Sequence, residues 1–124
     1  MIKYTLEYPI HSSIKILYAR LSTLSGLSEW FADDVNSRGK KFSFFWDGSE
    51  EVAELITKKT DQFIKFRWEE EEDEEAYFEF RITTDDLTND VSLLVTDYAD
   101  EDEVEESKQL WESQINSLLH AIGS

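Results

Sequence analysis

The spacing of apolar residues divides the chain into one strand, two helical segments, a run of strands and a final helix. Apolar residues that alternate with polar ones indicate strands, whereas apolar residues three and four positions apart indicate helices. Alternation of period two covers residues 2–10, 35–46, 50–58, 62–68, 76–82 and 91–98. Helical spacing covers residues 14–24 and 100–122, and a second short helix is expected through Trp30 and Phe31. This order predicts an α+β domain, because helices must cover one face of the sheet.

Residues that favour turns and caps lie between these elements. Asp47-Gly48 predicts a hairpin turn, since type I′ turns require positive φ at both central residues. A serine at position 12 or 13 can cap the first helix, and Ser25 or Ser28 can cap the second after a break at Ser25-Gly26. No repeat or linker interrupts the pattern, so residues 1–124 are expected to form one domain.

The stretch LSEWFADDV, residues 27–35, joins the helices to the sheet and raises the first question of function. Trp30 and Phe31 are adjacent, so on a helix their side chains point about 100° apart, and at most one should face straight into the sheet. Either one ring lies at the mouth of a cavity, or both plug the end of the sheet against Trp111. The second alternative is favoured, because apolar residues in a small domain usually pack in the core.

Large rings also alternate along the strands and should share the inward face of the sheet. These rings are Phe44, Trp46, Phe66, Trp68, Phe78 and Phe80. They either fill the centre of the domain or line a cavity of ligand size, and so many rings favour a filled core. The candidate wall or gate residues of a ligand site are Trp30, Phe31, Phe44, Trp46, Trp68, Phe80 and Trp111.

Composition narrows the classes of partner. The chain is 40% hydrophobic and 14% aromatic, and its 12 basic and 28 acidic residues give a net charge of −16. Nucleic acid and anionic membrane surfaces are disfavoured as partners, because both are bound through clustered Lys and Arg. There are no cysteines, which excludes disulfides and thiolate metal sites. The sequence shows no signal peptide and no long apolar run, so a cytoplasmic monomer without membrane insertion is expected.

No catalytic or metal-binding motif is present, and neither a cofactor nor a catalytic residue is expected. The acidic run at residues 69–75 lacks the spacing of an EF-hand and is interpreted as a solvated loop. The acidic pairs and clusters Asp33-Asp34 and 97–102 are interpreted as helix caps and solubilising ends. His11 and His120 are expected at the surface without a catalytic partner.

Acid–base chemistry would require an ionisable group on the inward face of the sheet. Alternation places Arg67, Glu79 and Arg81 on the opposite face, where they are expected to form ion pairs across strands. An enzyme is therefore not favoured.

The order of elements, together with four segments, resembles the START-like (SRPBCC, Bet v 1-like) helix-grip superfamily. The segments are LSEWFADDV, FSFFWDG, DDLTNDVSLLVTDYADEDE and LWESQINSLLHAIG. Within the superfamily the sequence is most similar to small bacterial START-like domains related to activators of the heat-shock protein 90 ATPase. The resemblance implies a curved sheet of about seven antiparallel strands, two short N-terminal helices, and a long C-terminal helix with a cavity beneath it.

Members of this superfamily differ in function, and three hypotheses remain. The first is non-enzymatic binding of a small hydrophobic ligand between the sheet and the C-terminal helix. The second is an interaction module, like the chaperone activators, that contacts a basic protein partner. The third and weakest is a cyclase-like or hydrolase-like enzyme that uses the same cavity.

Overall fold

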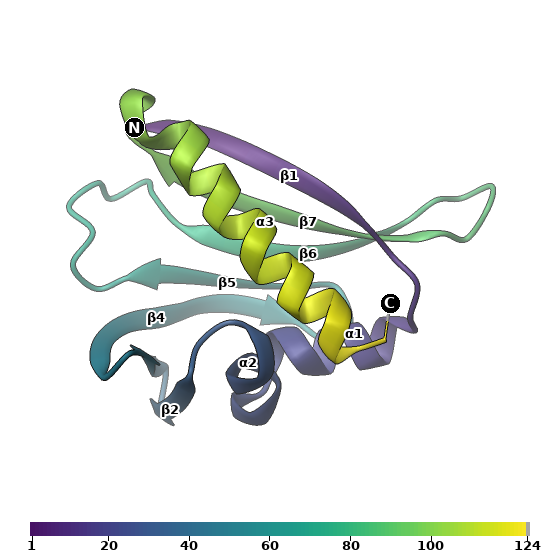
Figure 1. Ribbon diagram of the computed structural model, residues 1–124, viewed down its shortest axis with the longest axis horizontal. Coiled ribbons are helices and arrows are strands. Elements are labelled where there is room, and N and C mark those ends of the chain that lie inside the picture. The colour runs from purple at the N-terminus through teal and green to yellow at the C-terminus, as the bar shows by residue number, and fades with distance from the viewer. Residues whose placement is uncertain (124) are drawn as a thin grey trace.

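The computed structural model describes residues 1–123 and shows a seven-stranded antiparallel sheet covered on one face by helix (Figure 1). The strands are β1 (Ile2–Ile10), β2 (Asp34–Arg38), β3 (Lys41–Trp46), β4 (Ser49–Lys59), β5 (Phe63–Trp68), β6 (Phe78–Thr84) and β7 (Val91–Ala99). The helices are α1 (Ile14–Ser22), α2 (Leu24–Trp30) and α3 (Val104–Ala121), with a 3₁₀ turn, η1 (Glu101–Glu103), before α3. The predicted α+β helix-grip fold is confirmed.

The sheet is a meander that the first strand completes. Strands β2 to β7 pair with their neighbours in chain order, and β1 pairs with β7 from Ile2 opposite Ala99 to Ile10 opposite Val91. A register shift between Leu55 and Thr57 of β4 marks an irregularity of the kind that bends a strand. Helix α3 crosses the inner face of the sheet diagonally (Figure 1).

Aromatic rings fill the centre of the domain. Phe44, Phe66, Phe78 and Phe80, on β3, β5 and β6, have no exposed surface. Their rings lie in contact, with the centroids of Phe66 and Phe78 5.2 Å apart. The alternation left open whether the inward rings fill the centre of the domain or line a cavity there. At the centre they pack against one another and do not enclose an empty space.

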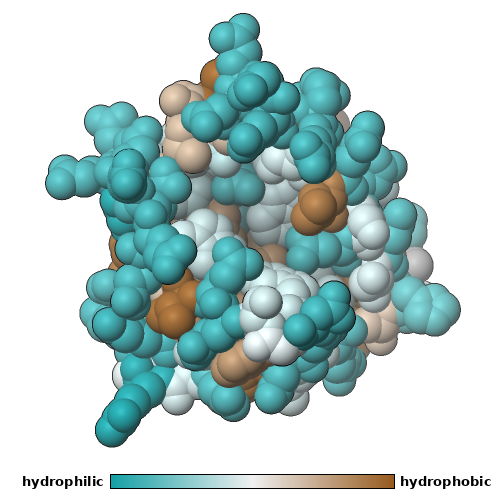
Figure 2. Space-filling view, turned by 60° about the vertical axis from the view of Figure 1, so that its left-hand side comes forward, coloured by the Kyte–Doolittle hydropathy of each residue, from teal (hydrophilic) through white to brown (hydrophobic). Residues whose placement is uncertain are grey.

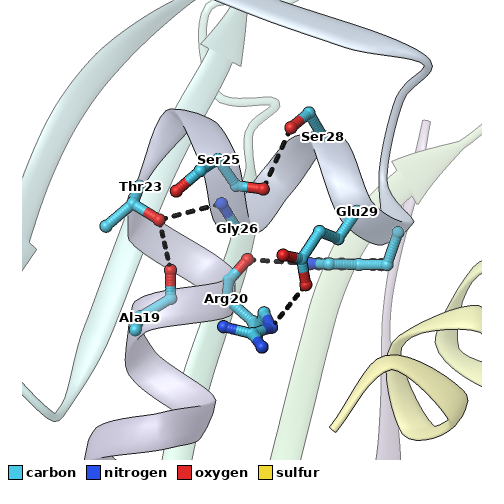
Figure 3. A network of polar contacts seen from close by, with 8 residues as sticks. Ala19, Arg20, Thr23, Ser25, Gly26, Ser28 and Glu29 are labelled. Carbon is cyan, nitrogen blue, oxygen red and sulfur yellow. Dashed lines mark hydrogen bonds and ion pairs between the residues drawn. The ribbon is translucent and has the colours of Figure 1, made fainter.

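The two short helices meet at Thr23, and not at the Ser25-Gly26 break expected from the sequence. The Thr23 hydroxyl accepts a hydrogen bond from the Gly26 amide at 2.9 Å and donates one to the Ala19 carbonyl at 2.7 Å (Figure 3). Gly26 therefore lies inside α2, directly against α1. A Cβ atom there would lie 2.3 Å from the Ala19 carbonyl oxygen and 2.7 Å from Arg20 Cα, so glycine permits the close approach of the two helices.

The expected caps are only partly present. Ser13 caps α1, accepting a hydrogen bond from the Ile16 amide at 3.1 Å. Asp100 and Glu103, which precede η1 and α3, form no capping hydrogen bond with their side chains. Asp33 is also not a helix cap, because its carboxylate accepts the backbone N–H of Asp47 at 2.8 Å and so holds the β3–β4 turn.

The charged residues of β5 and β6 do not pair across strands as expected. Arg81 pairs with Glu79 of the same strand, with 3.0 Å between Nε and Oε1. Arg81 lies opposite Phe63 and covers that ring, with its guanidinium carbon 4.3 Å from the centroid. Lys65 lies opposite Glu79, but its ammonium lies over the Tyr77 ring instead, 3.8 Å from the centroid. Arg67 donates instead to backbone carbonyl oxygens of the loop after β5. Within residues 1–123 no helix is long and apolar enough to cross a membrane.

Candidate functional site

A groove of about 1130 Å³ opens along one side of α3. Its walls come from α3 between Glu106 and Ser117 with the end of η1, from the junction of α2 and β2, and from the ends of strands β3, β4, β5 and β7. Figure 2 shows a hollow in this side of the molecule, with a floor of intermediate to apolar residues and a largely hydrophilic rim. This groove therefore lies at the flank of the helix, between α3 and the sheet, and is open to solvent.

All four tryptophans of the chain line this groove, although they come from four different elements. Three of their indole N–H groups donate hydrogen bonds of 2.8 Å, which fix the rings in place. Trp30 donates to the Arg20 carbonyl, and Trp46 donates to the Phe31 carbonyl. Trp111 donates to the Asp97 carboxylate. These three rings of the floor of the groove are thus held in position by the protein's own hydrogen bonds.

Phe31 lies at the centre of the aromatic contacts. Its ring stacks on Trp111 of α3, with centroids 5.8 Å apart and planes at 17°, and meets Phe44 of the sheet edge-on at 5.0 Å. Trp30 and Phe31 both contact Phe80, at 5.4 Å and 5.9 Å. Both rings therefore touch the sheet, although their side chains leave α2 in different directions, because α2 ends between the sheet and α3.

The residues predicted for a ligand site fall into two groups. Those that line the groove are Trp30, Phe31, Trp46, Trp68 and Trp111. The other two, Phe44 and Phe80, have no exposed surface and support the floor from below. Among the lining rings, Trp46 and Trp68 keep the most exposed surface, because they stand at the ends of their strands and beyond the cover of α3.

Asp97 is a half-buried carboxylate on the inward face of β7, where the sequence analysis placed a solubilising end. Its Oδ2 accepts hydrogen bonds from Trp111 Nε1 at 2.8 Å and from the Tyr4 hydroxyl at 3.4 Å, and its Oδ1 accepts the Tyr98 amide at 2.8 Å. Tyr4 also contacts the Ser107 hydroxyl. This cluster fastens α3 to β1 and β7 at one end of the groove.

The signal that could have identified Asp97 is the alternation of β7 itself. Leu93, Val95, Asp97 and Ala99 follow one another at period two, and the three apolar members are buried. Burial raises the pKa of Asp97 above its usual range, despite the hydrogen bonds that act in the opposite direction. Burial also raises the pKa of Tyr4 to about 12, so Tyr4 remains a hydrogen-bond donor at neutral pH.

Replacing Asp97 with asparagine should change both the stability and its pH dependence. Asparagine offers one acceptor oxygen where the carboxylate offers two, so we expect a loss of about 1–3 kcal/mol. The folded protein binds the Asp97 proton more tightly than the unfolded chain does, so this residue's contribution to stability falls as the pH rises from about 4 through the raised pKa. Urea unfolding at a series of pH values should show the difference between wild type and D97N shrinking over that window. A difference that does not vary with pH would contradict the raised pKa.

The rim of the groove is acidic. The carboxylates that line it are Glu29, Asp33, Glu51, Asp97, Glu103 and Glu106, and among residues 1–123 no Lys, Arg or His lines it. Sequence reasoning missed Glu51 as well as Asp97. Glu51 lies opposite Phe44 in the β3–β4 register, and directly opposed residues share a face of the sheet, so Glu51 belongs to the inward face.

Neither a metal site nor a histidine-centred site lies at the groove. Among residues 1–123 no group of His, Asp and Glu side chains could hold a metal ion. His11 and His120 are both exposed, and neither lines the groove. The chemistry available at the site is therefore that of indole rings, hydroxyl groups and carboxylates.

A curved antiparallel sheet that grips a long C-terminal helix, with a groove at their junction, defines the helix-grip class of domain. The chain belongs to the START-like superfamily, since the model of that domain matches residues 1–124. The resemblance expected from the sequence is confirmed.

Solved structures agree with this assignment. A Bacteroides fragilis protein, BfR322, is 36% identical over 97% of this chain and 90% of its own, with a TM-score of 0.68. The Aha1 dimer from Colwellia psychrerythraea is 18% identical over 98% of this chain and 96% of its own, with a TM-score of 0.82. DynU16, a protein of the dynemicin biosynthetic locus, is 13% identical over 98% of this chain and 47% of its own, with a TM-score of 0.79. The last two show likeness of fold alone. A comparison with curated proteins found no match.

Proposed function

We propose that this START-like domain binds a small ligand with an apolar portion in the groove beside α3, without catalysing a reaction. The observation that carries the proposal is the convergence of all four tryptophans on one groove of about 1130 Å³. Ligand sites are concave, largely apolar and formed in advance, and three of these indoles are fixed by hydrogen bonds.

Catalysis is less well supported than binding. Asp97 is an inward-facing acid with a raised pKa, which an enzyme of this fold would need. However, both of its oxygens accept hydrogen bonds from the protein, so the carboxylate serves to hold the wall of the groove. A general acid or base must instead reach a proton of the substrate, and the oxygens of Asp97 are already engaged by the protein.

The tryptophans supply the test of ligand binding. A neutral apolar probe such as N-phenylnaphthylamine should change the tryptophan emission and should stabilise the fold by about 2.7 kcal/mol at a hundredfold excess over its Kd. Leu110 lines the groove and is 59% exposed, so Leu110→Gln should weaken binding with little effect on folding. Leu87→Gln is the matched control, because Leu87 is 94% exposed in the β6–β7 loop. Unchanged emission, or equal weakening by both variants, would contradict the proposal.

The second candidate is a protein-interaction domain with a basic partner, similar in role to chaperone activators. The net charge of −16 and the acidic rim favour it, because complementary charge speeds association. The rate of association with such a partner should fall steeply as salt is raised. A partner whose association rate does not depend on salt would count against this candidate.

A further inference from the structure

The charges around the groove are of one sign, and some of them are not neutralised by the protein. Glu29 is paired with Arg20, with 2.8 Å between Oε2 and Nε (Figure 3), and Asp33 and Asp97 accept hydrogen bonds from neighbouring groups. The remaining lining carboxylates are Glu51, Glu103 and Glu106. They are exposed and form no side-chain hydrogen bond or ion pair within residues 1–123.

These three carboxylates come from two sides of the groove. Glu51 lies near the start of β4, whereas Glu103 ends η1 and Glu106 lies in the first turn of α3. All three would repel an anionic ligand in the groove. A neutral apolar ligand would displace the water that hydrates these carboxylates and would offer them no hydrogen bond in return. A cation would instead be attracted from both sides.

The floor of the groove suits the same kind of ligand. Trp46 and Trp68 are only half-buried, and their rings lie 6.2 Å apart at the open part of the floor. Indole is the side chain that attracts cations most strongly through its ring face, while its hydrocarbon surface accepts apolar groups. Leu110, exposed on α3, adds an aliphatic contact.

We infer that the ligand of the groove is a small organic cation that carries an apolar portion, such as an alkylammonium compound. The inference rests on the proposed function and specifies its ligand class. The groove is of the size that small ligands occupy. A second copy of this chain is disfavoured as the occupant, because each copy carries a net charge of −16.

Three amphiphiles that share one alkyl tail separate the effect of charge from that of apolar burial. Octyltrimethylammonium, octanol and octanoate, each below its micelle concentration, are titrated into the full chain while tryptophan emission is followed. We expect octyltrimethylammonium to bind about tenfold more tightly than octanol, and octanoate to bind most weakly.

Two triple variants with the same net charge distinguish the local effect of the groove carboxylates from the overall electrostatic field of the protein. Glu51→Gln, Glu103→Gln and Glu106→Gln together change the net charge from −16 to −13, and they should weaken octyltrimethylammonium binding about tenfold and leave octanol unaffected. Glu7→Gln, Asp86→Asn and Asp90→Asn make the same change in charge at exposed positions that do not line the groove, and should have little effect. All six replaced side chains are exposed, so folding should be preserved in both variants.

Each contrary result has a distinct meaning. If octanol or octanoate binds as tightly as octyltrimethylammonium, or if both triple variants weaken the cation equally, the inferred ligand class is wrong and the groove remains a ligand site. If a peptide of alternating lysine and leucine displaces octyltrimethylammonium at lower concentration, the groove belongs to a protein partner and the small cation is wrong. If none of the three amphiphiles changes the emission, the proposed function fails as well.

Discussion

Replacing Phe31 with alanine should destabilise the protein by about 3–5 kcal/mol, which is a large share of the stability of a small domain. The ring is 3% exposed and touches rings of the sheet, of α2 and of α3. Its removal leaves a cavity between elements that cannot close without moving α3, because the neighbouring rings are held by their own hydrogen bonds. Urea unfolding followed by circular dichroism measures the loss.

Phe45→Ala provides the matched control for this effect. It is the same chemical change on β3, but Phe45 lies on the opposite face of the strand from Phe44 and is only half-buried. We expect its cost to be well below that of Phe31→Ala, at about 1 kcal/mol. Equal losses for the two variants would contradict the central position given to Phe31.

Replacing Gly26 with alanine should be the second most damaging change, although the substitution is favourable in most helices. Alanine is a better helix former than glycine by about 1 kcal/mol, and Gly26 lies inside α2. The new methyl group would nevertheless lie 2.3 Å from the Ala19 carbonyl oxygen and 2.7 Å from Arg20 Cα, both backbone atoms of α1. We expect a net loss of about 3 kcal/mol in the unfolding free energy, because α1 and α2 must separate.

Ser25→Ala on the same helix gives the control for Gly26→Ala. Ser25 is exposed and adjacent in sequence, so its replacement tests helix propensity without the clash and should stabilise by a few tenths of a kcal/mol. A stabilising effect of Gly26→Ala would show that α1 and α2 are not packed as closely as the structure has them.

The residues that hold the fold together also form the floor of the groove. The Phe31 carbonyl accepts hydrogen bonds from both Trp46 and Gln114, at 2.8 Å and 3.0 Å, and so joins α2 to β3 and α3. Variants of these residues would change stability and binding together. Substitutions at the rim, at Leu110 and at the unpaired carboxylates, separate the two because those side chains are exposed.

Much of the fold could be predicted from the sequence because period and turn signals are local. The strand expected at residues 50–58 is observed at Ser49–Lys59, and the final helix expected at residues 100–122 is observed as η1 followed by α3. The break between the first helices lies at Thr23 and not at Ser25-Gly26, because the low helix propensity of Gly26 does not end the helix. The tight contact with α1 that explains this glycine depends on the packing of two helices.

The candidate site could be predicted only in its aromatic part. Five of the seven predicted wall residues line the groove. Alternation identifies Trp46 and Trp68 as inward rings of their strands, and helical spacing places Trp111 on the apolar face of the final helix. Alternation does not give position along a strand relative to a helix far away in sequence. Alternation therefore could not show that Phe44 is fully buried in the core whereas Trp46, at the end of the same strand, lines the groove.

By itself the sequence determined the order of elements, the face of each strand, the family resemblance and the strong excess of acid. The tertiary structure alone decided that the centre is filled, that the free space lies at the flank of α3, and that four tryptophans and three unpaired carboxylates meet there. The physical reason is that this groove is bounded by α2, α3 and the ends of several strands. Residues as far apart in the sequence as Ser28 and Ser117 become its neighbours only when the sheet bends around the helix.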